Sequence, residues 1–106
     1  MSGVGTLFFV VTVDVDPEVE ADFNEWYTGT HMPAVVACPG FVRGTRLQAS
    51  DDEASPRYAA VYEVEHDGVL DTPELAAIRG FGRFAEHTSN HSRFWFRSVA
   101  EVGDDA

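Results

Sequence analysis

Segments with the hydrophobic alternation of a strand and segments with the hydrophobic spacing of a helix follow one another along this chain. Their order constrains the fold more than any other feature. Residues 7–15 carry an apolar side chain at every odd position, which predicts a strand. Asp16-Pro17-Glu18 then provides a helix cap, a first-turn proline and an acidic residue near the positive end of the helix dipole. A helix is therefore expected from about Pro17 to about His31. Gly29, Pro33 and Pro39-Gly40 should break regular helix, with room for one further turn over residues 34–37.

The second half of the chain predicts two strands, a helix and a last strand. Residues 41–49 and 57–66 alternate and are separated by an acidic, turn-rich segment, which favours an antiparallel pair. Asp71-Thr72-Pro73-Glu74 predicts a helix start, with Asp71 or Thr72 as the cap and an inward stripe from Leu75 to Ala85. The polar residues 86–92 should end this helix, and residues 94–102 should form the last strand.

The resulting β-α-β-β-α-β order is that of the ferredoxin-like fold, an α+β architecture with a four-stranded antiparallel sheet and its helices on one face. We expect one domain over residues 1–106, with an ordered core at about 4–102. The other sheet face, with candidates such as Phe8 and Val10, is apolar and needs a cover. A second copy packed sheet to sheet would supply it, so we predict a homodimer. The alternative is a monomer with a partly polar open face.

The charge of the chain excludes several functions. It has 18 Asp and Glu against 7 basic residues, for a net charge of −11, and every basic residue is arginine. Lysine Schiff bases and phosphate-loop lysines are therefore absent. The acidic balance also argues against nucleic acids and anionic membrane surfaces as partners, so the expected ligand is small, neutral or largely apolar. No cofactor motif was found, and none is expected.

Cysteine usage and hydropathy bear on the cellular compartment. Cys38 is the only cysteine, which leaves no intramolecular disulfide and no thiolate cage for zinc, and this pattern suits the cytoplasm. The longest apolar stretch, residues 7–13, is far short of a membrane-spanning helix. We expect a cytoplasmic protein that does not enter the membrane.

His31 is the first candidate for chemistry. It follows Tyr27 by one helical turn and stands beside the break at Pro33, where a side chain can face a cavity. A neutral imidazole there could take or give a proton without a cofactor. The alternative is that His31 caps the last carbonyl groups of the helix.

Aromatic residues are the candidates for ligand contacts. Trp26 and Tyr27 are adjacent on a helix, so one can line a pocket while the other packs in the core. Tyr58 and Tyr62 share a strand face, and their hydroxyl groups could converge on a ligand. Phe84 in the second helix joins this set. Plain core packing is the alternative for each of them.

Two further groups of side chains could bind a metal or an anion. His87 and His91 are four residues apart, a spacing that suits a metal on a continuous helix, but Thr88-Ser89-Asn90 argues against continuity and a third ligand is missing. We therefore predict no metal site, with His87 as a ligand contact and either histidine able to reach a pocket mouth. Arg43 and Arg46 are expected on opposite faces of their strand, so at most one could steady an anionic oxygen. Salt bridges with carboxylates are the alternative.

Residues 26–33 (Trp-Tyr-Thr-Gly-Thr-His-Met-Pro), followed by Pro39-Gly40-Phe41 at a strand start, resemble the signature of the EthD-like proteins in the dimeric α/β-barrel superfamily. The resemblance implies a ferredoxin-like subunit that pairs with its twin, and a pocket between sheet and helices or near the dimer seam. Superfamily relatives include cofactor-independent monooxygenases, muconolactone-type isomerases and polyketide cyclases. By this motif His31 becomes the acid/base and Tyr27 its neighbour. The second histidine of the cyclase-like relatives has no clear counterpart, unless His87 or His91 fills that role.

The resulting hypothesis is a protein of secondary metabolism or degradation. It would bind a small hydrophobic or aromatic metabolite and catalyse a cofactor-free proton transfer, as in isomerisation, cyclisation or monooxygenation. The alternative is a non-catalytic accessory protein that binds or carries a pathway intermediate. A third hypothesis is a pure assembly module, which would have no ligand-sized cavity.

Overall fold

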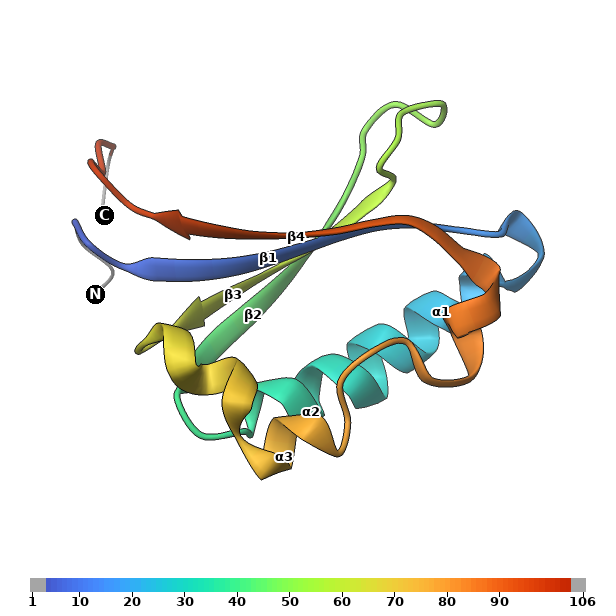
Figure 1. Ribbon diagram of the computed structural model, residues 1–106. Coiled ribbons are helices and arrows are strands. Elements are labelled where there is room, and N and C mark those ends of the chain that lie inside the picture. The colour runs from blue at the N-terminus through green and yellow to red at the C-terminus, as the bar shows by residue number, and fades with distance from the viewer. Residues whose placement is uncertain (1–3, 104–106) are drawn as a thin grey trace.

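A four-stranded antiparallel sheet covered on one face by helical segments forms the framework (Figure 1). The computed structural model describes residues 4–103. The strands are β1 (Leu7–Val15), β2 (Phe41–Gln48), β3 (Tyr58–Val64) and β4 (Thr88–Arg97), in the sheet order β2-β3-β1-β4. This confirms the predicted ferredoxin-like α+β fold. The last three residues of the tail expected beyond residue 102 lie outside the described residues.

The first helical segment runs through Pro33 without the predicted break and ends at Val36, within the further turn predicted over residues 34–37. It comprises the 3₁₀ turn η1 (Pro17–Val19), α1 (Glu20–Trp26), the π turn η2 (Tyr27–His31) and α2 (Met32–Val36). The break expected at Pro33 was wrong. In the π turn the Met32 N–H donates to the carbonyl oxygen of Tyr27, five residues back. This wider turn places Pro33 in the first turn of α2, where a missing N–H is tolerated.

The second helical region is more broken than predicted. It comprises η3 (Asp67–Asp71), α3 (Pro73–Ala76) and η4 (Gly82–His87). Thr72 caps α3 as predicted, because its hydroxyl accepts a hydrogen bond of 3.2 Å from the Leu75 N–H. The expected continuous helix to Ala85 was wrong. Gly80 and Gly82 adopt φ values of +101° and +53°, in the left-handed region, and interrupt the helix.

Strand β4 begins earlier than predicted, at Thr88 instead of Phe94, and ends at Arg97. Its polar first half pairs with β1, Thr88 opposite Val15 and Ser92 opposite Thr12. Because β4 is an edge strand, its polar side chains stay exposed, and the alternation that would have revealed a strand is missing. The earlier start places His91 and Arg93 on the sheet.

A register shift between Phe41 and Arg43 changes the faces of β2. Phe41 packs edge-on against Tyr62 at 5.7 Å between ring centroids, and the Arg46 guanidinium lies 4.7 Å from the Tyr27 ring centroid. Both residues therefore face the helical layer, whereas strict alternation had placed them on opposite faces. An irregularity of this kind inserts one residue and reverses the faces beyond it.

The two sheet faces differ in what covers them. On the helix-covered face Phe9, Tyr62 and Val64 are buried, together with Phe23 of α1. The open face is also apolar, as expected at Phe8 and Val10. On this face Leu47, Phe94 and Phe96 are exposed, with exposed fractions of 43% for Phe94 and 55% for Phe96. Phe8 and Val10 are half-buried, with Phe96 opposite Phe8 and Phe94 opposite Val10. Among the described residues no helix is long and apolar enough to cross a membrane.

The turn before β2 generates a stability prediction. Gly40 has a φ of +86°, and a Cβ there would lie 2.4 Å from Cγ1 of the buried Val69. We expect Gly40→Ala to lower the free energy of unfolding by about 2 kcal/mol or more in urea denaturation, because strain and overpacking add. Gly80→Ala is the control, since its φ is +101° but nothing lies within 4 Å, and strain alone should cost about 1 kcal/mol. Equal losses in the two variants would contradict the clash with Val69.

Candidate functional site

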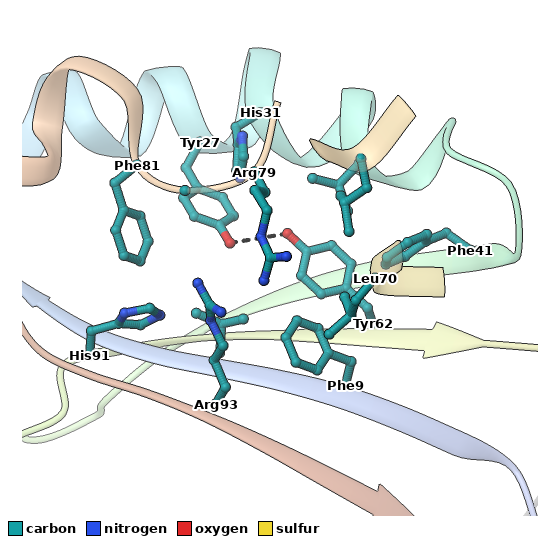
Figure 2. Close-up of a pocket in the computed structure, with 14 residues that line it drawn as sticks. Phe9, Tyr27, His31, Phe41, Tyr62, Leu70, Arg79, Phe81, His91 and Arg93 are labelled. Atoms are coloured by element: carbon teal, nitrogen blue, oxygen red, sulfur yellow. Dashed lines mark hydrogen bonds between the residues drawn. The ribbon is translucent and has the colours of Figure 1, made fainter. Parts of the chain in front are cut away.

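A pocket opens between the helix-covered face of the sheet and the helical layer. It encloses about 460 Å³, counting the part that is open to solvent. Its sheet side is formed by all four strands, and its other side by η2, α2, η3, α3 and the loop after α3 (Figure 2). Most of the lining is apolar, including Phe9, Val35, Phe41, Leu75 and Phe81. A lining of this kind suits a small, largely apolar molecule.

A pair of tyrosine hydroxyl groups forms the polar part of the inner wall. The hydroxyl oxygens of Tyr27 and Tyr62 lie 3.0 Å apart, and both side chains are buried (Figure 2). Burial raises the pKa of both phenols, so both are protonated at neutral pH. One hydrogen is used in the bond between them. The hydrogen of the second hydroxyl is left to be donated to a ligand oxygen.

His31 lies next to this pair, on the same π turn as Tyr27. Its ring stacks on Trp26 at 4.7 Å between centroids and meets the Tyr27 ring edge-on at 4.9 Å. Burial lowers the pKa of the imidazole, which favours the neutral form. Within residues 4–103, His31 makes no hydrogen bond, neither to a helix carbonyl, as capping would require, nor to another side chain. Because it lines the pocket, its imidazole is available to a ligand.

Positively charged side chains lie on the solvent side of the pocket. Arg79 extends from the loop after α3, and Arg93 rises toward the same space from β4 (Figure 2). His91, also on β4, packs edge-on against Phe81 at 4.9 Å. Either His87 or His91 was expected to reach a pocket mouth, and His91 lines the pocket. The sequence pattern missed both arginines because it placed Arg79 on a continuous helix and Arg93 before the last strand.

Tyr58 and Arg46 lie in a separate, smaller hollow with Tyr27. The Tyr58 hydroxyl donates to the Glu20 carboxylate and accepts a hydrogen bond of 2.9 Å from the Asn24 amide. The Arg46 guanidinium lies 5.0 Å from the Tyr58 ring centroid. The hydroxyl groups of Tyr58 and Tyr62 therefore do not converge on one ligand site.

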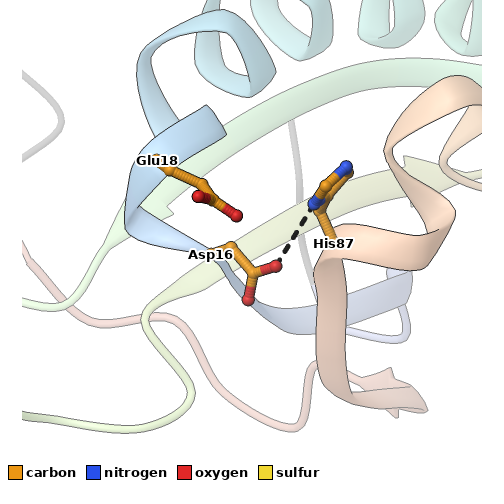
Figure 3. Close-up of side chains that lie close together, drawn as sticks. All are labelled: Asp16, Glu18 and His87. Atoms are coloured by element: carbon orange, nitrogen blue, oxygen red, sulfur yellow. Dashed lines mark hydrogen bonds and ion pairs between the residues drawn. The ribbon is translucent and has the colours of Figure 1, made fainter.

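Three other candidates lie outside the pocket lining. Trp26 and Phe84 pack against each other at 5.4 Å, and Trp26 reaches the site only through its stacking on His31. His87 pairs with Asp16 at 3.2 Å, with Glu18 nearby (Figure 3). One ligand atom from each of Asp16, Glu18 and His87 lies within 4.8 Å of the others. Exposed acidic groups of this kind are common without an ion. His91 is on β4 and does not continue a helix from His87, as expected.

The comparisons with known proteins identify a family without a described function. The family model described as a domain of unknown function (DUF4286) matches residues 6–91. A search of the curated proteins finds no match.

Solved structures share the fold at low sequence identity. A dabb family protein with a ferredoxin-like fold from Mesorhizobium loti is 10% identical, with a TM-score of 0.70 over 91% of this chain and 99% of that chain. The heme-degrader MhuD from Mycobacterium tuberculosis, with two hemes bound in its active site, is 22% identical, with a TM-score of 0.67 over 92% and 99%. An ethyl tert-butyl ether d (ethd) family protein from Bacillus halodurans is 14% identical, with a TM-score of 0.67 over 89% and 99%. An EthD family protein is thus among the structural neighbours.

The burial of His31 predicts a pH effect on stability. Because its folded pKa lies below the ordinary histidine value of about 6.5, the unfolded chain takes up this proton first as the pH falls. We expect the stability due to neutral His31 to be complete above about pH 6.5 and to be lost below it. An NMR titration should give a midpoint for His31 below 6.5, and His31→Gln should lose less stability than the wild type between neutral and mildly acidic pH. A midpoint at or above 6.5 would contradict the buried placement.

Proposed function

We propose that this chain, a member of the DUF4286 family, binds a small aromatic molecule in its pocket and moves a proton on it. The family is described as a domain of unknown function, so the proposal is based on the pocket of this chain. One observation carries this proposal. A hydrogen-bonded pair of buried phenols and an imidazole with no hydrogen bond among the described residues share one apolar pocket. Such a combination suits acid/base chemistry more than simple packing.

The roles of the three side chains follow from their protonation. The ring of the ligand would lie against Phe9, Phe41 and Phe81. Its carbonyl or phenolic oxygen would accept the free hydroxyl hydrogen of the Tyr27–Tyr62 pair. Neutral His31 would then take a proton from the adjacent carbon, while the tyrosine hydrogen bond stabilises the charge that develops on the oxygen.

Several reactions begin with this step. In an isomerisation His31 returns the proton to a different carbon, and in a cyclisation the enolate carbon attacks a second carbonyl. In a monooxygenation, the same anion would react with molecular oxygen. The structure of the heme-degrader MhuD holds two hemes in its active site. This supports the proposal that a fold of this kind can accept flat aromatic ligands.

Hydrogen exchange tests the proton transfer without knowledge of the natural reaction. We expect the protein to accelerate the exchange of acidic C–H hydrogens of 2-tetralone or benzoylacetone in D₂O, measured by NMR. His31→Gln should slow this exchange by about 10²-fold or more, and Tyr62→Phe by about 10²-fold, since each removes one catalytic contribution.

Tyr58→Phe is the matched control for Tyr62→Phe. Its hydroxyl is bound to Glu20 and Asn24 outside the main pocket, so exchange should keep the wild-type rate. Probes that bind but exchange no faster than in buffer would contradict catalysis and favour a non-catalytic carrier. Equal loss of exchange in both tyrosine variants would contradict the role given to Tyr62.

We further propose that two copies pack through the open sheet face. Phe94 and Phe96 are 43% and 55% exposed, and both are paired across strands with apolar residues of β1. Exposed aromatic side chains grouped in this way are unfavourable in water unless a partner covers them. A second copy offers a self-complementary surface of the same chemistry.

Charge placed on this face should prevent dimerisation. In sedimentation velocity we expect the wild type at twice the mass of one chain and Phe96→Arg at the mass of one chain, because the buried guanidinium would lack a partner. Val99→Arg is the control, since Val99 is 85% exposed and lies beyond the end of β4. A monomeric wild type, or a dimeric Phe96→Arg, would overturn the proposed interface.

A further inference from the structure

Two arginines of the pocket differ from the other arginines of the chain. The guanidinium groups of Arg79 and Arg93 make no hydrogen bond and no ion pair within residues 4–103. The other five each have a described partner: Arg43 pairs with Glu63, Arg46 with Asn24, Arg57 with Glu20, Arg83 lies over the Phe84 ring, and Arg97 donates to the Gly5 carbonyl. The two arginines without partners are the two that line the main pocket.

Among residues 4–103, no acidic side chain lines the pocket. This is unusual for the chain, which has 18 Asp and Glu against 7 Arg and a net charge of −11. The polar residues of the pocket are Arg79, Arg93, His31, His91 and the tyrosine pair. Local charge in the pocket is therefore opposite in sign to the charge of the whole molecule.

Two guanidinium groups that face one space repel each other, and an anion between them would remove the repulsion. Arg79 and Arg93 come from opposite sides of the pocket and extend toward each other (Figure 2). Planar guanidinium groups match the two oxygens of a carboxylate, with parallel hydrogen bonds to both. The remaining lining is mostly apolar and aromatic, which suits a ring better than a sugar or a free inorganic ion.

We propose that the ligand of this pocket is an aromatic carboxylate whose carboxylate is held by Arg79 and Arg93. This inference rests on the proposed function, because it names the class of molecule that the same pocket binds. Both arginines are exposed side chains on the solvent side, whereas Tyr27, Tyr62 and His31 are buried. The carboxylate therefore lies at the mouth, the ring against the apolar wall, and the oxygen that reacts lies at the tyrosine pair.

Matched acids and amides test the charge of the ligand. Calorimetric titrations at neutral pH would compare benzoate, 2-naphthoate and anthracene-2-carboxylate with their primary amides, which keep the shape and lose the charge. For the ring that fits, we expect the acid to bind about 10- to 100-fold more tightly than the amide, because charged hydrogen bonds are the stronger ones. The negative charge of the whole chain opposes acid binding, so a preference for the acid has to come from the pocket.

Arginine variants locate the preference. Arg79→Gln and Arg93→Gln should each reduce the advantage of the acid by about tenfold, and the double variant should abolish it, while amide binding stays at the wild-type level. Unchanged amide binding also shows that the variants are folded. Arg83→Gln is the control, because it removes the same charge from a residue outside the pocket lining.

The outcomes separate this inference from the proposed function. Equal binding of acid and amide by the wild type would overturn the carboxylate proposal and leave the aromatic pocket. An acid preference that survives in the double variant would overturn the role of the two arginines. Failure of every acid and amide to bind would overturn both proposals.

Discussion

The hydrogen bond from the Met32 N–H to the Tyr27 carbonyl oxygen, across five residues, is the constraint on which the site depends. It widens one turn of the first helical segment and lets that segment continue through Pro33 to Val36. The same turn places Tyr27 and His31 on one face, with their rings 4.9 Å apart. Without it, Pro33 would end the helix and α2 could not close the side of the pocket. π turns are frequent at functional sites.

The hydroxyl bond between Tyr27 and Tyr62 connects this turn to the sheet. It joins the helical layer to β3 at the centre of the sheet, at an oxygen separation of 3.0 Å. Two buried hydroxyl groups need partners, and each satisfies the other. The arrangement leaves one hydrogen for a ligand, so the interaction that stabilises the packing also provides the donor of the proposed chemistry.

Helices on only one face give the two sides of the sheet different tasks. The covered side holds the core and the pocket, and its polar groups are tyrosine, histidine and arginine. The open side carries apolar residues from all four strands, among them Phe8, Val61, Leu47 and Phe96. Because the pocket is on the covered face and the exposed apolar residues are on the open face, one small chain can have both a ligand site and a surface suited to a second copy.

Sequence patterns predicted the elements better than their ends. β1 has the predicted bounds, and Thr72 caps α3, because alternation and capping are local effects. The predicted helix to Ala85 failed because the apolar stripe did not account for the left-handed φ of Gly80 and Gly82. The start of β4 was missed because an exposed edge strand needs no alternation.

Site residues divide in the same way. Local patterns in the sequence predicted the order of strands and helices and pointed to Tyr27, His31 and Tyr62, which line one pocket. Three other features depend on the tertiary structure: Tyr58 turns to Glu20, His87 pairs with Asp16, and Arg79 and Arg93 line the same pocket. The physical reason is that periodicity depends on neighbours three or four residues away, whereas these contacts depend on strand register and loop path. Register and loop path are set by the packing of the whole chain.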